Sequence, residues 1–124
     1  MEKRSVPNFA LGLMSGTSCD GISAALVEFR GRTFRLIGER TLPYSNTLSS
    51  RLQRADTLTS PALSSLNMEL GEHLARAALR LLRSARVSPR RIAVIGSHGH
   101  TIYHGPRDVI PSTLQLGEPA VIAE

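Results

Sequence analysis

The sequence predicts one α/β domain built on a mixed β-sheet, and three observations carry this prediction. First, three apolar stretches near the start of the chain are separated by compact turns, as in an antiparallel meander. Second, a long stretch follows with leucine or alanine at every third or fourth position, which indicates an amphipathic helix. Third, another short apolar stretch comes after this helix, and a helix between two strands favours a parallel crossover. The 124 residues are enough for one domain with a core.

The meander is predicted from strand periodicity. The first strand is expected at Val6–Met14 and the second at Ser23–Phe29, where alternate residues separate into two faces. Arg30-Gly31-Arg32 predicts a tight turn between the second strand and a third. That third strand is expected at Thr33–Leu42, and Pro43 ends it.

The helical part of the chain is bounded by prolines. A short helix is expected at 49–55, and Ser60-Pro61 predicts the start of a long one with Ser60 as N-cap. Ser88-Pro89 ends the long helix, and Ile92–Ile95 is typical of a strand buried on both faces. A short strand at 114–116 and a helix opening at Glu118-Pro119 are expected to follow. The predicted buried face of the long helix consists of Leu63, Leu66, Leu70, Leu74, Ala77 and Leu81.

Two residues beside this apolar face carry predictions of their own. Gly71 would let the long helix approach a neighbour closely. Asn67, one turn away, is either a buried structural amide or a ligand contact, and the structural interpretation is favoured.

The turn between the first two strands is the first candidate site. Small residues let a backbone approach a ligand, their N–H groups can converge on an anion, and a carboxylate can hold a metal ion directly or through water. The same composition is typical of a plain hairpin turn, so the residues leave both interpretations open. A nucleophilic Cys19 is disfavoured, because no neighbour lowers its pKa and Asp20 would raise it. The turn contains Ser15, Gly16, Thr17, Ser18, Cys19, Asp20 and Gly21.

The second candidate site follows the last buried strand, where α/β proteins place ligand-binding loops. Residues 96–101 read GSHGHT and are predicted to form such a loop. His98, His100 and His104 would share one face of an extended strand, which raises a zinc site as one interpretation. No cysteine or carboxylate stands at a matching spacing, so hydrogen bonding to a polar ligand is favoured over a metal, and a purely structural histidine remains an alternative.

The composition argues against two kinds of binding partner, nucleic acids and membranes. The net charge of +5 comes from scattered arginines, and aromatic residues make up only 4%, so a nucleic-acid interface is not expected. No apolar run approaches the roughly 20 residues of a membrane helix, so no membrane partner is expected. A single cysteine, Cys19, excludes an internal disulfide framework and is typical of a reducing cytoplasm.

Three motifs in register resemble the anhydro-N-acetylmuramic acid kinases. They are LMSGTSCDG at 13–21, IGSHGHT at 95–101 with His104, and TLQLGEPAVIAE at 113–124, and the pairs Leu66-Asn67 and Leu70-Gly71 match as well. This resemblance implies the RNase H-like fold of actin, sugar kinases and Hsp70, in which two domains enclose ATP in a cleft. It also implies ring opening of the 1,6-anhydro sugar by water and phosphorylation at O6 by ATP with Mg²⁺. The product would be N-acetylmuramic acid 6-phosphate, in peptidoglycan recycling.

The resemblance also implies roles for individual residues. Asp20 would be the metal-linked carboxylate, and Ser97, His98 and Gln115 would lie near the sugar. Three residues depart from the family pattern: Cys19 stands for a leucine, Ser23 for an aspartate and His100 for a glutamine. The ATP phosphate segment would consist of Gly16, Thr17, Ser18, Cys19, Asp20, Gly21, Ile22 and Ser23.

Family members are considerably longer than this chain. The resemblance therefore implies that residues 1–124 form a truncated N-terminal domain, inactive by itself. The catalytic base, the adenosine site and the second domain would lie beyond residue 124, and a homodimer of the full-length protein stays open. A non-catalytic module that binds a sugar or nucleotide is the alternative of a different class.

Overall fold

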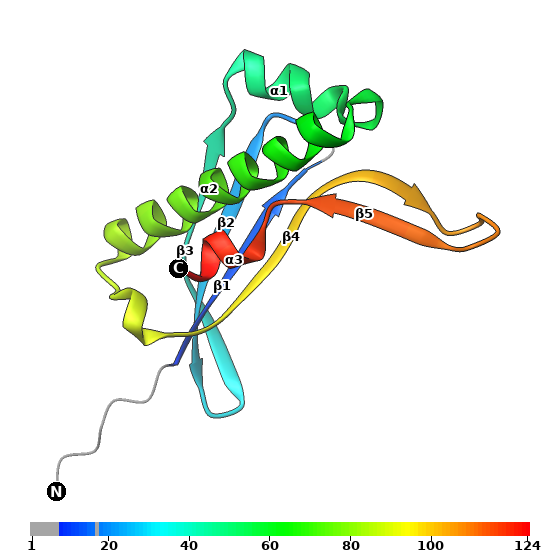
Figure 1. Ribbon diagram of the computed structural model, residues 1–124. Helices are drawn as coiled ribbons and strands as arrows, with labels where there is room; N and C mark the ends of the chain where they lie inside the picture. Colours follow the sequence, from blue (N-terminus) through cyan, green and yellow to red (C-terminus); the bar gives the residue numbers. More distant parts are fainter. Residues whose placement is uncertain (1–7, 17) are drawn as a thin grey trace, which may run out of the picture.

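A computed structural model describes residues 8–16 and 18–124, so Val6 of the first predicted strand and Thr17 of the first candidate site lie outside the described residues. Five strands form one mixed sheet in the order β3–β2–β1–β4–β5 (Figure 1). The first three pair antiparallel, β4 runs parallel to β1, and β5 pairs antiparallel with β4. The predicted fold class, a meander followed by a helix-linked parallel strand, is confirmed. The strands are β1 (Phe9–Ser15), β2 (Gly21–Arg30), β3 (Thr33–Pro43), β4 (Ile92–Gly105) and β5 (Ser112–Leu116).

Helix α2 (Ser60–Ala85) is the crossover between β3 and β4. It begins one residue earlier than predicted, because Thr59 rather than Ser60 occupies the N-cap position. The leucine spacing buries one face against the sheet, as predicted, and Leu63 is half-buried at its edge. Arg86 ends the helix in the left-handed conformation, with φ of 57°. The buried residues of the predicted face are Leu66, Leu70, Leu74, Ala77 and Leu81.

The shorter helices lie before and after α2. Helix α1 (Asn46–Gln53) starts earlier than predicted, because Ser45 caps it by accepting from the Leu48 N–H at 3.2 Å. Two 3₁₀ turns, η1 (Ala55–Thr57) and η2 (Pro89–Arg91), precede α2 and β4. Helix α3 (Pro119–Ala123) opens at the predicted Glu118-Pro119. None of the helices in residues 8–16 and 18–124 is both long and apolar enough to cross a membrane.

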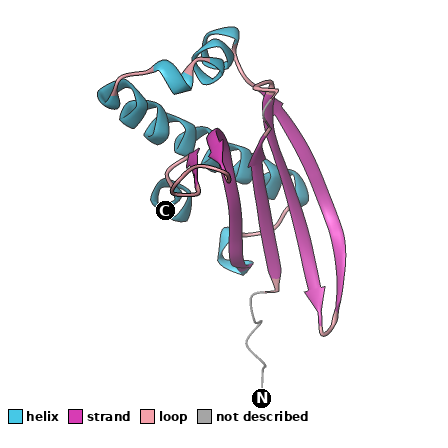
Figure 2. Cartoon of the chain, turned by 90° about the vertical axis from the view of Figure 1, so that its right-hand side faces the viewer, coloured by secondary structure: helices cyan, strands magenta, loops and turns pink. Residues whose placement is uncertain are grey.

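Helices cover one face of the sheet and leave the other open (Figure 2). In β1 the residues Phe9, Leu11 and Leu13 are buried under α2, while Gly12 and Met14, which alternate with them along the strand, are exposed. This alternation is the two-residue period expected for a half-buried strand. The prediction that Ile92–Ile95 is buried on both faces is wrong, because the Val94 side chain is 58% exposed on the open side.

Strand β4 is much longer than predicted and contains an irregularity. The predicted loop 96–101 is wrong, since these residues continue the strand to Gly105. Leu13 pairs with Ser97, but Ser15 pairs with His100, so β4 contains one extra residue at this point. Gly99 accommodates this β-bulge with φ of +70°. The extra residue reverses the alternation and turns His100 toward the core, so His98 and His100 do not share a face.

Candidate functional site

The turn between β1 and β2 is fixed by three hydrogen bonds to its backbone. The Cys19 N–H donates to the Gly16 carbonyl at 3.0 Å, which closes the turn. Cys19 has φ of 57°, a left-handed conformation uncommon outside glycine. Its carbonyl accepts from the Ser49 hydroxyl at 2.6 Å, and the Asp20 carbonyl accepts from the Tyr44 N–H at 2.9 Å. The turn is therefore held from α1 and from the end of β3.

The side chains of this turn divide into two groups. Ser18, Asp20 and Ser23 are exposed, and the Ser18 hydroxyl donates to Asp20 Oδ1 at 2.9 Å. Cys19, Gly21 and Ile22 are buried and face the interior. The exposed serines and the carboxylate are thus the side chains of the described turn that can meet a ligand.

Gly21 is required by packing. A Cβ on this residue would lie 2.5 Å from the Leu42 carbonyl oxygen, so β2 and β3 approach too closely here for any side chain. Its presence in the motif thus has a structural reason independent of any ligand.

Beneath the turn lies a chain of hydrogen-bonded side chains. The Tyr44 hydroxyl donates to Ser15 Oγ at 2.7 Å, and Ser15 Oγ lies 2.8 Å from His100 Nδ1. On the other side of the imidazole, His100 Nε2 lies 3.5 Å from Cys19 Sγ. Ser15 and His100 are each 2% exposed, and Cys19 is 4% exposed. The chain connects the ends of β1 and β3 to β4 and to the turn itself.

Burial shifts the pKa values of the side chains in this series of hydrogen bonds. It lowers the pKa of His100, which favours the neutral imidazole, and it raises the pKa of Tyr44 to about 12. Burial, and then the neighbouring Asp20 carboxylate, raise the pKa of the Cys19 thiol. Cys19 is therefore a buried thiol rather than an activated nucleophile, in line with its sequence-based interpretation.

Sequence reasoning missed Tyr44. Only its position as an aromatic residue directly after Pro43, in an otherwise polar segment, marks it. Ser15 was assigned to the turn, but its link to His100 depends on the bulge in β4, for which Gly99 is the sole local signal.

The three residues expected near a sugar lie in three different surroundings. Ser97 faces the helix-covered side, in a groove of about 510 Å³ between α2, β4 and α3. His98 follows directly in the strand and lines a hollow of about 690 Å³ on the open face, together with Ser23, Met14 and Arg40. The Gln115 amide donates to the hydroxyl oxygens of Thr113 at 2.6 Å and Thr101 at 3.3 Å. The structure thus brings His98 and Ser23 together and separates both from Ser97.

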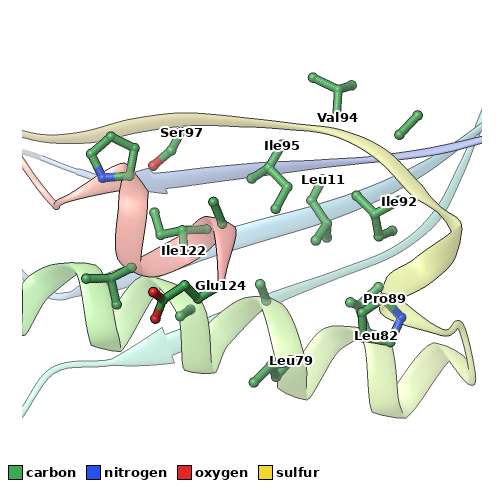
Figure 3. A pocket seen from close by; sticks show the side chains of 16 residues that line it. Leu11, Leu79, Leu82, Pro89, Ile92, Val94, Ile95, Ser97, Ile122 and Glu124 are labelled. Atoms are coloured by element: carbon green, nitrogen blue, oxygen red, sulfur yellow. The ribbon is translucent and has the colours of Figure 1, made fainter.

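The groove that holds Ser97 is mainly apolar. Leu11, Ile92, Ile95 and Ile122 point into the space between α2 and β4, with Ser97 at one end (Figure 3). Ser97 and Glu124 supply its polar side chains, whereas the open-face hollow is lined by more of them: Ser23, Glu39, Arg40, Thr41 and His98.

Comparison with known proteins identifies the family. The family model described as anhydro-N-acetylmuramic acid kinase matches residues 8–124. The chain belongs to this family. It is 42% identical over 127 residues to an anhydro-N-acetylmuramic acid kinase of Caldanaerobacter subterraneus subsp. tengcongensis. It is also 42% identical over 125 residues to one of Bacillus thuringiensis subsp. konkukian and to others of Bacillus cereus.

The matches cover nearly all of this chain but only part of each relative. They span 92% and 93% of the chain, against 32% of the Caldanaerobacter kinase and 33% of the Bacillus thuringiensis kinase. The chain therefore spans about a third of the length of the curated anhydro-N-acetylmuramic acid kinases that it matches.

The carboxylate of the turn fits a magnesium ion that is held mainly by phosphates. Mg²⁺ commonly binds through one or two carboxylates, with substrate phosphates and water completing its shell. Asp20 supplies one exposed carboxylate, which suits such a kinase site. Among the described residues, no three histidine, cysteine or acidic side chains are placed to hold a metal ion, which counts against the zinc interpretation of the histidines.

Asn67 and Gly71 join α2 to the segment before α3. Asn67 Oδ1 accepts from the Gly117 N–H at 2.8 Å, and its amide donates to Glu118 Oε2 at 3.3 Å. A Cβ on Gly71 would lie 2.9 Å from the Glu118 carbonyl oxygen. The predicted close approach at Gly71 is confirmed, and the Asn67 contacts support the structural interpretation of this amide.

Proposed function

We propose that this chain forms the nucleotide-phosphate-binding domain of an anhydro-N-acetylmuramic acid kinase. That enzyme would open the 1,6-anhydro ring with water and transfer a phosphoryl group from ATP to O6, giving N-acetylmuramic acid 6-phosphate for peptidoglycan recycling. The observation that carries the proposal is the family match across residues 8–124, which includes the sequence of the β1–β2 turn. The single cysteine suits the reducing cytoplasm in which we place the reaction.

In this proposal the turn positions the phosphates. Phosphoryl transfer depends mainly on positioning and on stabilisation of charge, so a preorganised backbone is the contribution required of this domain. The segment Gly16–Ser23 would pass along the phosphates, with the Ser18 hydroxyl as a further donor. Asp20 would bind Mg²⁺ directly or through water, and the ion would neutralise charge on the phosphate oxygens.

The sugar would meet the same end of the sheet. His98 and Ser23 line one hollow, so an imidazole for the sugar lies beside the end of the phosphate segment. Ser97 and Gln115 would contact the margins of the sugar if the sugar extends across the edge of the sheet. The base that activates water, the adenosine site and the second wall of the cleft would come from the two thirds of the relatives' length that this chain does not span.

Asp20→Asn tests the assignment of the carboxylate. The substitution keeps the shape and an acceptor for Ser18 but removes the negative charge, so we expect MgATP to bind about tenfold more weakly. Binding of ATP without Mg²⁺ should change little, because no metal then bridges the carboxylate and the phosphates. Isothermal titration calorimetry with and without Mg²⁺ measures both, on residues 1–124 joined to the remaining two thirds of a relative, which would supply the adenosine site.

Asp56→Asn is the matched control for this substitution. Asp56 is an exposed aspartate of η1, outside the segment Gly16–Ser23, and its replacement should leave both affinities unchanged. Equal MgATP affinity of the Asp20→Asn variant and the unchanged chain would contradict the assignment of Asp20.

A further inference from the structure

The hydrogen-bonded chain beneath the turn has a direction. Because the Tyr44 hydroxyl donates to Ser15 Oγ, the serine hydrogen is available to His100 Nδ1. An imidazole that accepts at Nδ1 carries its proton on Nε2, which faces Cys19 Sγ at 3.5 Å. Each group then donates to the next, and a neutral His100 completes the chain. This tautomer is assigned from the hydrogen-bond network.

The His100 ring is the link in this chain that comes from a distant part of the sequence. Ser15 and Cys19 belong to the entry and the interior of the turn, whereas His100 lies in β4, 85 residues after Ser15. It reaches the turn because the bulge at Gly99 rotates it toward the core. The strand thus places one imidazole between Ser15 at the entry of the turn and Cys19 in its interior.

Cys19 is the residue whose position most needs support. Its left-handed backbone is unfavourable for a residue with a side chain. The carbonyl is held by Ser49 and the side chain by His100. Asp20 follows directly, so the backbone of Cys19 determines where that carboxylate emerges.

We propose that His100 is a positioning residue that holds residues 18–20 in the conformation that receives the nucleotide phosphates. This inference rests on the proposed function, since it assigns a purpose to the geometry of that turn. His100 touches neither phosphate nor metal. It acts through Ser15 and Cys19, and it makes the placement of Asp20 depend on β4, the strand that also carries His98.

The first test uses the unchanged chain and needs no variant. In nitrogen-15 NMR of a histidine-labelled sample, we expect His100 to show one neutral tautomer with the proton on Nε2. Because burial lowers its pKa, it should remain neutral at pH values where exposed histidines, with pKa near about 6.5, are protonated. A ring that averages between tautomers and titrates like an exposed imidazole would overturn the proposal.

The second test compares two substitutions at the same position. His100→Leu removes both contacts, so we expect MgATP to bind about tenfold more weakly and the backbone amide signals of residues 18–21 to shift or broaden. His100→Gln offers a donor and an acceptor again and should restore most of the affinity. His104→Leu, at an exposed position of the same strand, should change neither readout.

The outcomes separate this proposal from the proposed function. A folded His100→Leu variant with unchanged turn signals and unchanged MgATP affinity would overturn the positioning assignment. If residues 1–124 joined to the remaining two thirds of a relative bind no MgATP, the nucleotide assignment of the turn fails. The tautomer and the turn signals then decide whether His100 holds the turn. If His100→Leu does not fold, the tautomer of His100 in the unchanged chain decides whether the positioning assignment holds.

Discussion

Gly99→Ala should destabilise the domain by about 3 kcal/mol or more. Gly99 has φ of +70°, and a Cβ at this position would overlap the Leu116 carbonyl oxygen. The substitution therefore adds backbone strain and a collision with β5 at the bulge that aims His100. Urea denaturation followed by circular dichroism measures the change in the free energy of unfolding.

Two other glycines separate the causes of this effect. Gly31 has a similar φ of +61° but open space around its Cβ position, so Gly31→Ala should cost only the conformational strain, about 1 kcal/mol. Gly12 has ordinary backbone angles and open space, and Gly12→Ala should stay within about 0.5 kcal/mol of the unchanged chain. Equal losses for Gly99→Ala and Gly31→Ala would contradict the collision with Leu116.

Leu70→Ala should destabilise the domain by between about 2 and 5 kcal/mol. Leu70 is fully buried in the middle of α2, so truncation removes apolar contact and leaves a cavity in the core. Alanine has a high helix propensity, so the loss reports packing rather than a broken helix. Thermal and urea unfolding curves provide the measurement.

Leu79→Ala is the matched control on the same helix. The Leu79 side chain is 43% exposed, so its truncation should cost less than about 1 kcal/mol. A comparable loss at both positions would contradict the assignment of the Leu70 face as the one that packs on the sheet.

The sequence was sufficient to predict the parts of the fold that depend on local patterns. The leucine spacing of α2 gave its buried face, and Pro61 and Pro89 marked its limits to within a few residues. The two hairpins of the meander followed from strand alternation and from the turn at Gly31. In each case the signal and the structure it specifies lie within a few residues of one another.

The parts that were wrong or missed depend on contacts between distant segments. Nothing near residues 96–101 shows that they will pair with β1, or that β5 will pair with residues 100–105 and extend β4 to Gly105. A β-bulge can be predicted only where a strand is already expected. The reversal that buries His100 against Ser15 therefore cannot be derived from the sequence. The exposure of Val94 has the same kind of cause, because it reflects which face the described helices cover.

The candidate site shows the same division. The motif of the β1–β2 turn was visible as a run of small and polar residues, and the family match includes it. The structure adds that Cys19, Gly21 and Ile22 face inward, so they can contribute to a ligand only through their backbone. Cys19 and His100, two residues at which the resemblance implies a departure from the family pattern, are in contact with each other. Because the two residues are 81 positions apart in the sequence, this contact could not be predicted from it.

A chimeric protein tests the central claim most directly. Residues 1–124 would replace the corresponding third of the Caldanaerobacter subterraneus kinase, to which they are 42% identical. ATP-dependent phosphorylation of anhydro-N-acetylmuramic acid is then measured for the chimera and for the separate chain. We predict turnover by the chimera and none by the chain alone. A folded chimera without turnover would contradict the assignment of this domain, and turnover by the chain alone would contradict its dependence on the remaining two thirds.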